Sequence, residues 1–157
     1  MSVRVSHSRD QTGEWEVDVR ILLPTDHLIV QDIEKSEAAK TTDGSSIPAG
    51  WKGVDIGPKT LAELLPQIKA AKTIFWNGPA GIFEMAPYSK GTMEMAKAVA
   101  AAAKAGTTAV VGGGDSVAAV GKAGVADQIT YISTGGGASM EFLEGQELPG
   151  VKALPEA

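Results

Sequence analysis

The sequence contains no cysteine among its 157 residues. A disulfide framework is therefore excluded, and so are zinc and iron–sulfur sites built on cysteine ligands. No apolar run approaches the roughly 20 residues that span a bilayer, and Met1 leads into polar sequence unlike a signal peptide. The 14 Lys and Arg residues are scattered and outnumbered by 19 Asp and Glu, so a nucleic-acid surface is not indicated. We expect a cytoplasmic protein that binds neither membranes nor nucleic acids.

With 43% hydrophobic and 21% charged residues, the chain is long enough for one domain with its own core. From residue 72 onward, one pattern occurs three times: a β-rich run, a glycine-rich loop and a helical stretch. The runs are KTIFW (72–76), TTAVV (107–111) and ITYIS (129–133). Strands without polar alternation, separated by helices, indicate a mostly parallel sheet covered on both faces. The pattern predicts a doubly wound, Rossmann-like α/β fold.

The predicted helices in this part cover residues 89–106, 116–124 and 138–145, and each ends at a glycine suited to a left-handed cap. Upstream, residues 21–30 form an apolar strand interrupted by Pro24, and residues 58–71 form a helix with Pro58 in its first turn. The polar residues 31–51 between them are predicted to be an exposed loop.

Residues 1–20 differ from the rest of the chain. VRVSHS (3–8) and EWEVDVRI (14–21) alternate apolar and polar residues, and RDQTG (9–13) can form a turn between them. The alternation predicts a β-hairpin. This hairpin either covers an exposed edge of the sheet or is an unrelated leader.

The two glycine runs, 112–114 and 135–137, follow predicted strands and precede predicted helices. Glycines allow a close backbone approach, and the helix start attracts an anion such as phosphate. The alternative is that both runs are only tight turns. Two such runs after adjacent parallel strands would lie together at the carboxyl edge, which favours a ligand site. Neither run is a Walker loop, and no G-x-G-x-x-G motif with its downstream acid is present.

Two further stretches carry candidate ligand contacts. Asp115 either caps the helix that follows it or holds Mg²⁺ beside nucleotide phosphates. WNGPAGIFE (76–84) forms a stiff loop that is either a structural turn or an apolar wall with one carboxylate for a base and ribose.

Linked motifs identify a family resemblance. GWKGVDIGPKT, FWNGPAGIFE, KGT, VVGGGDS, ISTGGGASMEFLEG and LPGVKAL occur in the order and spacing of the carboxyl-terminal part of phosphoglycerate kinase. The resemblance covers about residues 21–157, and we expect this range to be a partial nucleotide-binding domain, incomplete relative to the family. Residues 1–20 show no such resemblance and are set apart as an atypical leader.

The resemblance implies a kinase that transfers a phosphoryl group between 1,3-bisphosphoglycerate and Mg-ADP in glycolysis, with Mg-ADP or Mg-ATP as substrate and no prosthetic group. It implies an adenosine pocket, a phosphate loop whose Asp115 faces Mg²⁺, and a catalytic loop facing the transferred phosphoryl group. The implied adenosine contacts are Gly53, Val54, Asn77, Pro79, Ile82 and Glu84, the phosphate contacts are Gly112, Gly113, Gly114, Asp115 and Ser116, and the catalytic loop is Gly135, Gly136 and Gly137.

The resemblance also implies what is missing. The amino-terminal domain with its basic patch and arginine, and two strands with phosphate-neutralising lysines, have no counterpart here. We therefore expect the chain alone to keep part of the ADP/ATP site without kinase turnover, and a partner to be the missing half or another copy. The alternative is a non-catalytic binding or interaction module, possibly oligomeric, that reuses the fold. An oxidoreductase is disfavoured because the dinucleotide motif is absent.

Overall fold

The computed structural model describes residues 2–5 and 19–154. The chain divides into two compact units, residues 1–64 and 65–157, and each unit has β-sheets of its own. Helix α1 (Pro58–Ala70) contains the point of division. Within the described residues, no helix has the length and apolar character needed to cross a membrane.

The first unit begins with a pair of antiparallel strands, β1 (Ser2–Val5) and β2 (Val19–Leu22). Their register pairs Ser2 with Leu22 and Val5 with Val19. These strands lie within the predicted hairpin, whose residues 6–18 lie outside the described residues. The predicted turn at residues 9–13 lies outside the described residues.

A second, separate sheet of the first unit is also antiparallel, in the order β4-β3-β5. Strand β3 (His27–Val30) pairs with β4 (Lys40–Thr41) on one side and with β5 (Lys52–Ile56) on the other. The strand predicted at 21–30, with its interruption at Pro24, is present as β2 and β3 on either side of Pro24, and these two strands belong to different sheets. The predicted loop 31–51 contains β4 and a 3-10 helix, η1 (Ser36–Ala38), and β5 was not predicted at all.

A buried carboxylate joins β3 to the start of α1. Asp26 is fully buried, and its carboxylate accepts hydrogen bonds from the backbone N–H groups of Lys59 and Thr60 and from Thr60 Oγ1, at 2.7–2.9 Å. Asp26 thus caps a helix that begins more than thirty residues later. A Cβ on Gly57 would overlap this carboxylate, so the position before Pro58 has room only for glycine. The predicted helix with Pro58 in its first turn is confirmed.

Burial and hydrogen bonding act in opposite directions on this group. Desolvation raises the pKa of Asp26, but the hydrogen bonds from Thr60 and Lys59, together with the Lys59 charge, lower it further than burial raises it. The net pKa of Asp26 is therefore below its ordinary value. The carboxylate stays charged because the free N–H groups of the first helical turn solvate it.

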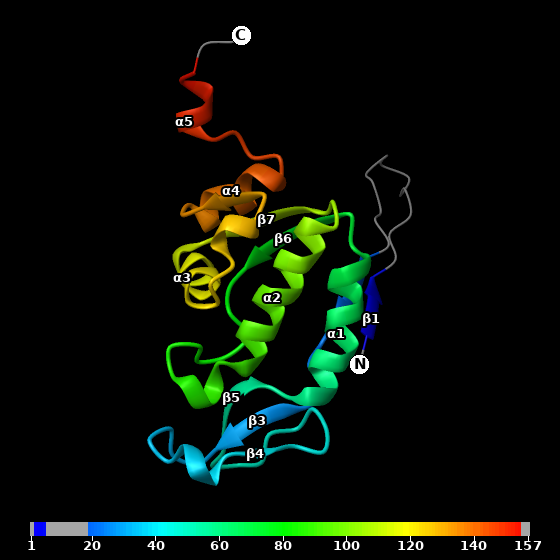
Figure 1. Ribbon diagram of the computed structural model, residues 1–157, viewed down its shortest axis with the longest axis vertical. Helices are drawn as coiled ribbons and strands as arrows, with labels where there is room; N and C mark the ends of the chain where they lie inside the picture. The colour runs from blue at the N-terminus through cyan, green and yellow to red at the C-terminus, as the bar shows by residue number, and fades with distance from the viewer. Residues whose placement is uncertain (1, 6–18, 155–157) are drawn as a thin grey trace. The chain divides into compact units, whose positions relative to one another are not determined.

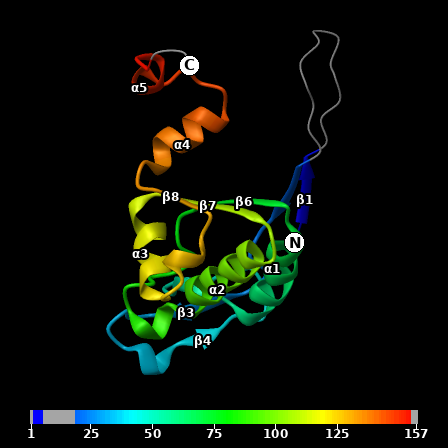
Figure 2. The same cartoon turned by 45° about the horizontal axis from the view of Figure 1, so that its top comes forward.

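The second unit contains the predicted parallel sheet. Its strands are β6 (Thr73–Asn77), β7 (Thr108–Gly112) and β8 (Tyr131–Ser133), in that spatial order. Helix α2 (Lys90–Lys104) connects β6 to β7 (Figure 1), and α3 (Gly114–Lys122) connects β7 to β8 (Figure 2). Each predicted strand is present within two residues of its expected ends, which confirms the α/β fold with a parallel sheet.

The remaining helices are short. Beyond β8 come α4 (Gly136–Leu143), which was predicted, and α5 (Pro149–Lys152), which was not. Figure 2 shows α4 beginning where β8 ends. Two further 3-10 helices, η2 (Ala86–Tyr88) and η3 (Ala126–Gln128), lie in the connections. The predicted helix stops at Gly106, Gly124 and Gly145 all have positive φ, at +101°, +68° and +82°.

The two faces of the parallel sheet differ in how well they are covered. On one face Trp76, Ala109 and Val111 are buried, as are apolar residues of α2 and α3, which contact each other and β7. The connections from β6 to β7 and from β7 to β8 cross the sheet in the same direction. Since such crossovers are right-handed, both place their helices, α2 and α3, on this same face.

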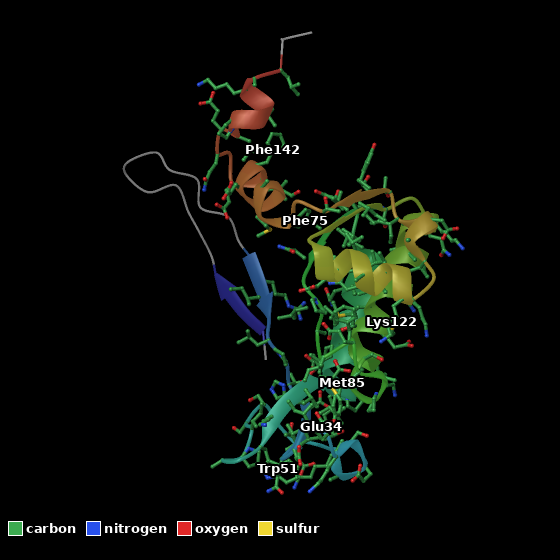
Figure 3. All side chains as sticks on the ribbon, turned by 90° about the vertical axis from the view of Figure 1, so that its left-hand side faces the viewer. Glu34, Trp51, Phe75, Met85, Lys122 and Phe142 are labelled. Carbon is green, nitrogen blue, oxygen red and sulfur yellow. The ribbon has the colours of Figure 1, made fainter. Side chains whose placement is uncertain are left out.

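On the other face, Phe75 and Val110 are half-buried and their neighbour in register, Tyr131, is 65% exposed. This face lines a groove of about 440 Å³, together with parts of β8, α4, α5 and their connections. Figure 3 shows Phe75 on the sheet and Phe142 on α4 at this groove. The sequence predicted helices covering both faces of the parallel sheet. Among the described residues, one face is buried under α2 and α3, and the other is only partly covered.

Candidate functional site

The three parallel strands end level with one another at their carboxyl edge. Asn77 at the end of β6 pairs in register with Gly112 of β7, and Gly112 pairs with Ser133 of β8. Helix α3 begins at Gly114 and α4 begins at Gly136, directly after this edge. The first N–H groups of a helix have no partner within it. Two sets of free N–H donors therefore start side by side.

The two glycine runs touch through their backbones. The N–H of Gly113 donates to the carbonyl of Ser133 at 2.9 Å. A Cβ on Gly136 would lie 2.7 Å from Gly113 Cα and 2.8 Å from its nitrogen, closer than real Cβ atoms come. Gly113 also has φ of +87°, a conformation open mainly to glycine. These contacts give Gly113 and Gly136 a structural reason to lack side chains.

The next glycine in each run has no such reason. A Cβ on Gly114 or on Gly137 would meet nothing within 4 Å. Both residues are exposed at the start of their helices. The turn interpretation accounts for Gly113 and Gly136, and it leaves Gly114 and Gly137 facing space that a ligand can enter.

Asn77 lies over both glycine turns. Its Oδ1 would be 2.7 Å from a Cβ on Gly113 and 3.0 Å from a Cβ on Gly136. The structure thus brings Asn77, residues 112–114 and residues 135–137 together at one place, as the position of the strand ends predicted.

Asp115 and Ser116, expected side by side at the phosphates, are placed differently. The Asp115 side chain is exposed, does not cap α3, and has no hydrogen-bond or ion-pair partner among the described residues. Ser116 is fully buried, and its Oγ accepts a 2.6 Å hydrogen bond from the N–H of Gly78. Asp115 is thus free to meet a ligand, while the Ser116 hydroxyl already holds the loop after β6.

A metal ion would have one protein carboxylate here. In the described part of the chain, no three His, Cys, Asp or Glu residues cluster as a metal site. Mg²⁺ commonly binds through one or two carboxylates together with substrate phosphates and water. A single free Asp115 beside two helix starts fits that kind of shared coordination.

The loop at residues 77–85 is held at three points. Besides the Ser116 contact, the N–H of Ala80 donates to Thr92 Oγ1 at 3.1 Å. Lys122 Nζ donates to the carbonyls of Phe83 and Glu84, at 2.6 Å and 3.1 Å. Pro79 and Ile82 are half-buried, and Glu84 is exposed with no side-chain partner among the described residues.

Sequence reasoning missed Lys122. Its one local signal is its place in the last turn of a helix, where lysines are common because they favour the dipole. That signal does not reveal a contact with a loop almost forty residues earlier in the chain.

Gly53 and Val54 lie on β5 in the first unit. Gly53 is exposed, and a Cβ there would lie 2.9 Å from Ile47 Cδ1. Val54 is 2% exposed, so its side chain belongs to the core of that unit. Only its backbone is left for the adenosine contact that the resemblance implies.

Comparisons with known proteins agree on one family. The family model described as phosphoglycerate kinase matches residues 7–146. This match begins inside the 1–20 segment that we set apart. A phosphoglycerate kinase from Leptospira biflexa is 55% identical over 145 residues, and one from Chloroflexus aurantiacus is 51% identical over 142 residues. These alignments cover 92% and 90% of this chain.

Solved structures give the same result. The phosphoglycerate kinase of Coxiella burnetii matches with a TM-score of 0.70 at 42% identity, and that of Pyrococcus horikoshii with 0.69 at 33% identity. Each match covers 83% of this chain, and 33% and 31% of the respective structures. The two curated relatives are covered over 35% and 36% of their own length, so this chain spans about a third of each. The chain belongs to the phosphoglycerate kinase family.

Proposed function

We propose that this chain carries part of the nucleotide site of a phosphoglycerate kinase and binds Mg-ADP or Mg-ATP at the carboxyl edge of β6, β7 and β8. The observation that carries the proposal is the contact between Gly113 and Gly136, which sets two helix starts side by side beneath Asn77. Backbone N–H groups at helix starts are suited to phosphate oxygens. The exposed, unpartnered Asp115 stands at one of these starts.

Each group then has a physical role. The N–H groups at the start of α3, beside Gly114, hold the nucleotide phosphates, and Asp115 holds the Mg²⁺ that accompanies them. The N–H groups at the start of α4, with the open side of Gly137, face the phosphoryl group in transfer between the nucleotide and the acyl phosphate of 1,3-bisphosphoglycerate. Such transfer depends mainly on positioning and on neutralising charge, which backbone donors and Mg²⁺ supply.

The adenosine would rest on the 77–85 loop. Pro79 and Ile82 offer apolar surface, and the free carboxylate of Glu84 suits the ribose hydroxyls. The chain alone would bind nucleotide without turning over, because the arginine and lysines that the family resemblance implies for catalysis have no counterpart in it.

Calorimetric titration of Mg-ADP tests this proposal. We expect the wild-type chain to bind and Asp115→Asn to bind more weakly, with the difference disappearing when Mg²⁺ is replaced by EDTA. Asp127→Asn is the matched control, since Asp127 is also an exposed aspartate of the second unit and has no partner among the described residues. Absence of binding by the wild-type chain, or equal affinity for Asp115→Asn and Asp127→Asn, would refute the proposal.

A second function is favoured by the half-covered face of the parallel sheet. Phe142 and Leu143 of α4 are 58% and 64% exposed beside the groove at Phe75. Exposed apolar surface of this kind marks interaction sites. A non-catalytic module using this face would form an oligomer that is indifferent to nucleotide, and sedimentation with and without Mg-ADP separates the two functions.

A further inference from the structure

Helix α3 contacts the loop at residues 77–85 at both of its own ends. At its start, the buried Ser116 Oγ accepts from Gly78 N–H at 2.6 Å. At its end, Lys122 Nζ donates to the carbonyls of Phe83 and Glu84. One rigid element therefore holds the first part and the last part of the same loop.

The Lys122 contact involves the segment that bears the proposed ribose group. Its ammonium lies 6.0 Å from the centre of the Phe83 ring, and Phe83 itself is 5% exposed. The buried ring anchors residue 83, and the lysine orients the backbone carbonyls of residues 83 and 84. Figure 3 shows Lys122 on α3.

The opposite end of α3 carries the proposed phosphate donors and Asp115. From this arrangement we propose that Lys122 is a positioning residue for nucleotide binding, fixing the Ile82–Glu84 segment relative to the phosphate donors at the start of the same helix. The inference rests on the proposed function. It assigns Lys122 no contact with the nucleotide, so its removal should weaken binding of the adenosine part and leave binding of the phosphate part unchanged.

The experiment compares two ligands on three variants. ADP engages both parts of the site, whereas tripolyphosphate, which has no adenosine, engages only the phosphate donors. Calorimetry with Mg²⁺ should show ADP affinity falling about three- to tenfold in Lys122→Met, with tripolyphosphate affinity unchanged to within about twofold. Lys122→Arg, which keeps the charge and the donors, should restore ADP affinity.

Lys104→Met is the matched control. Lys104 is the last residue of α2, as Lys122 is of α3, and it is exposed without a hydrogen-bond partner among the described residues. Hydrogen exchange adds a readout that needs no ligand: amides of residues 80–88 should exchange faster in Lys122→Met than in Lys104→Met, while those of β7 should not change.

The outcomes separate the two proposals. Equal ADP affinity in Lys122→Met and Lys104→Met, or equal weakening of ADP and tripolyphosphate in Lys122→Met, would overturn the role of Lys122 and leave the nucleotide site standing. A wild-type chain that binds neither ligand would overturn the proposed function and the role of Lys122 in it.

Discussion

Gly136 approaches Gly113 so closely that a Cβ on Gly136 would lie 2.7 Å from Gly113 Cα. Gly136→Ala must therefore push apart the turns that start α3 and α4. Overpacking of this kind typically lowers the free energy of unfolding by about 1–3 kcal/mol. We expect that loss in urea denaturation, together with weaker Mg-ADP binding.

Gly137→Ala is the matched control for this change, because a Cβ on Gly137 would meet nothing within 4 Å. Alanine in place of a helical glycine should leave stability unchanged or raise it by a few tenths of a kcal/mol. Equal stability of the two alanine variants would contradict the close contact of the glycine turns.

Asp26 should make the free energy of unfolding fall as the pH is lowered into the acid range. Its pKa is lowered in the folded chain from a reference value of 3.8, so the unfolded chain takes up the proton first as the pH falls. The stabilisation is complete above about pH 5 and is lost as the pH falls through the unfolded and then the folded pKa. In Asp26→Asn, the urea midpoint of unfolding should therefore fall less steeply below pH 5 than it does in the wild-type chain.

At pH 7, Asp26→Asn should also cost about 1–3 kcal/mol, because an amide nitrogen replaces one oxygen that accepts from the start of α1. Asp32→Asn is the control, since Asp32 is 51% exposed and its carboxylate meets the Lys35 ammonium and the N–H of Glu34 at the surface rather than a buried helix start. A wild-type urea midpoint that falls no more steeply below pH 5 than that of Asp26→Asn would count against the buried cap.

Ser116→Ala should loosen the start of the 77–85 loop. The variant removes the acceptor of the Gly78 N–H, and an unsatisfied buried donor costs about 1–3 kcal/mol. Hydrogen exchange should show the Gly78 amide losing protection, whereas Ser139→Ala, at a half-buried hydroxyl of α4 that bonds to Ser133 and Gly135, should leave it protected. Unchanged protection in Ser116→Ala would show that Gly78 has another acceptor.

Phe142→Ser tests the exposed face of the parallel sheet. Phe142 is 58% exposed, so its loss should change stability by no more than about 0.5 kcal/mol, yet lower the fluorescence of a dye that binds apolar surface. Phe83→Ser, at a site only 5% exposed, should instead destabilise by about 3–5 kcal/mol. Dye fluorescence that is the same in Phe142→Ser and wild type would show that this face is not the apolar surface available to solvent.

The parallel part of the fold could be read from the sequence because its signals are local. The runs at 72–76, 107–111 and 129–133 are rich in β-forming residues and are followed by Asn77, Gly112 and, after Thr134, Gly135. The ends of each run lie within two residues of the ends of a strand. Adjacent parallel strands must present their carboxyl ends at one edge. For that reason the meeting of residues 112–114 with residues 135–137 followed from the order of the elements.

The missed features depend on partners far along the chain. Strand β5 carries Lys52, Gly53 and Asp55 among its five residues, which hides any alternation, and only its pairing with β3 makes it a strand. The Asp26 cap and the Lys122 contact bridge more than thirty residues. No local pattern contains such contacts, so the antiparallel sheet and the loop anchor emerged only from the structure.

Because Ser116 and Lys122 of α3 both hold the 77–85 loop, the number of residues between them is constrained. An insertion between Ser116 and Lys122 would turn one anchor about 100° around the helix axis and shift it by about 1.5 Å relative to the other. Both could not then reach the 77–85 loop, although a substitution at the exposed Ala118 would disturb neither. Helix α3 should therefore tolerate changes of residue on its outer side and reject changes of length.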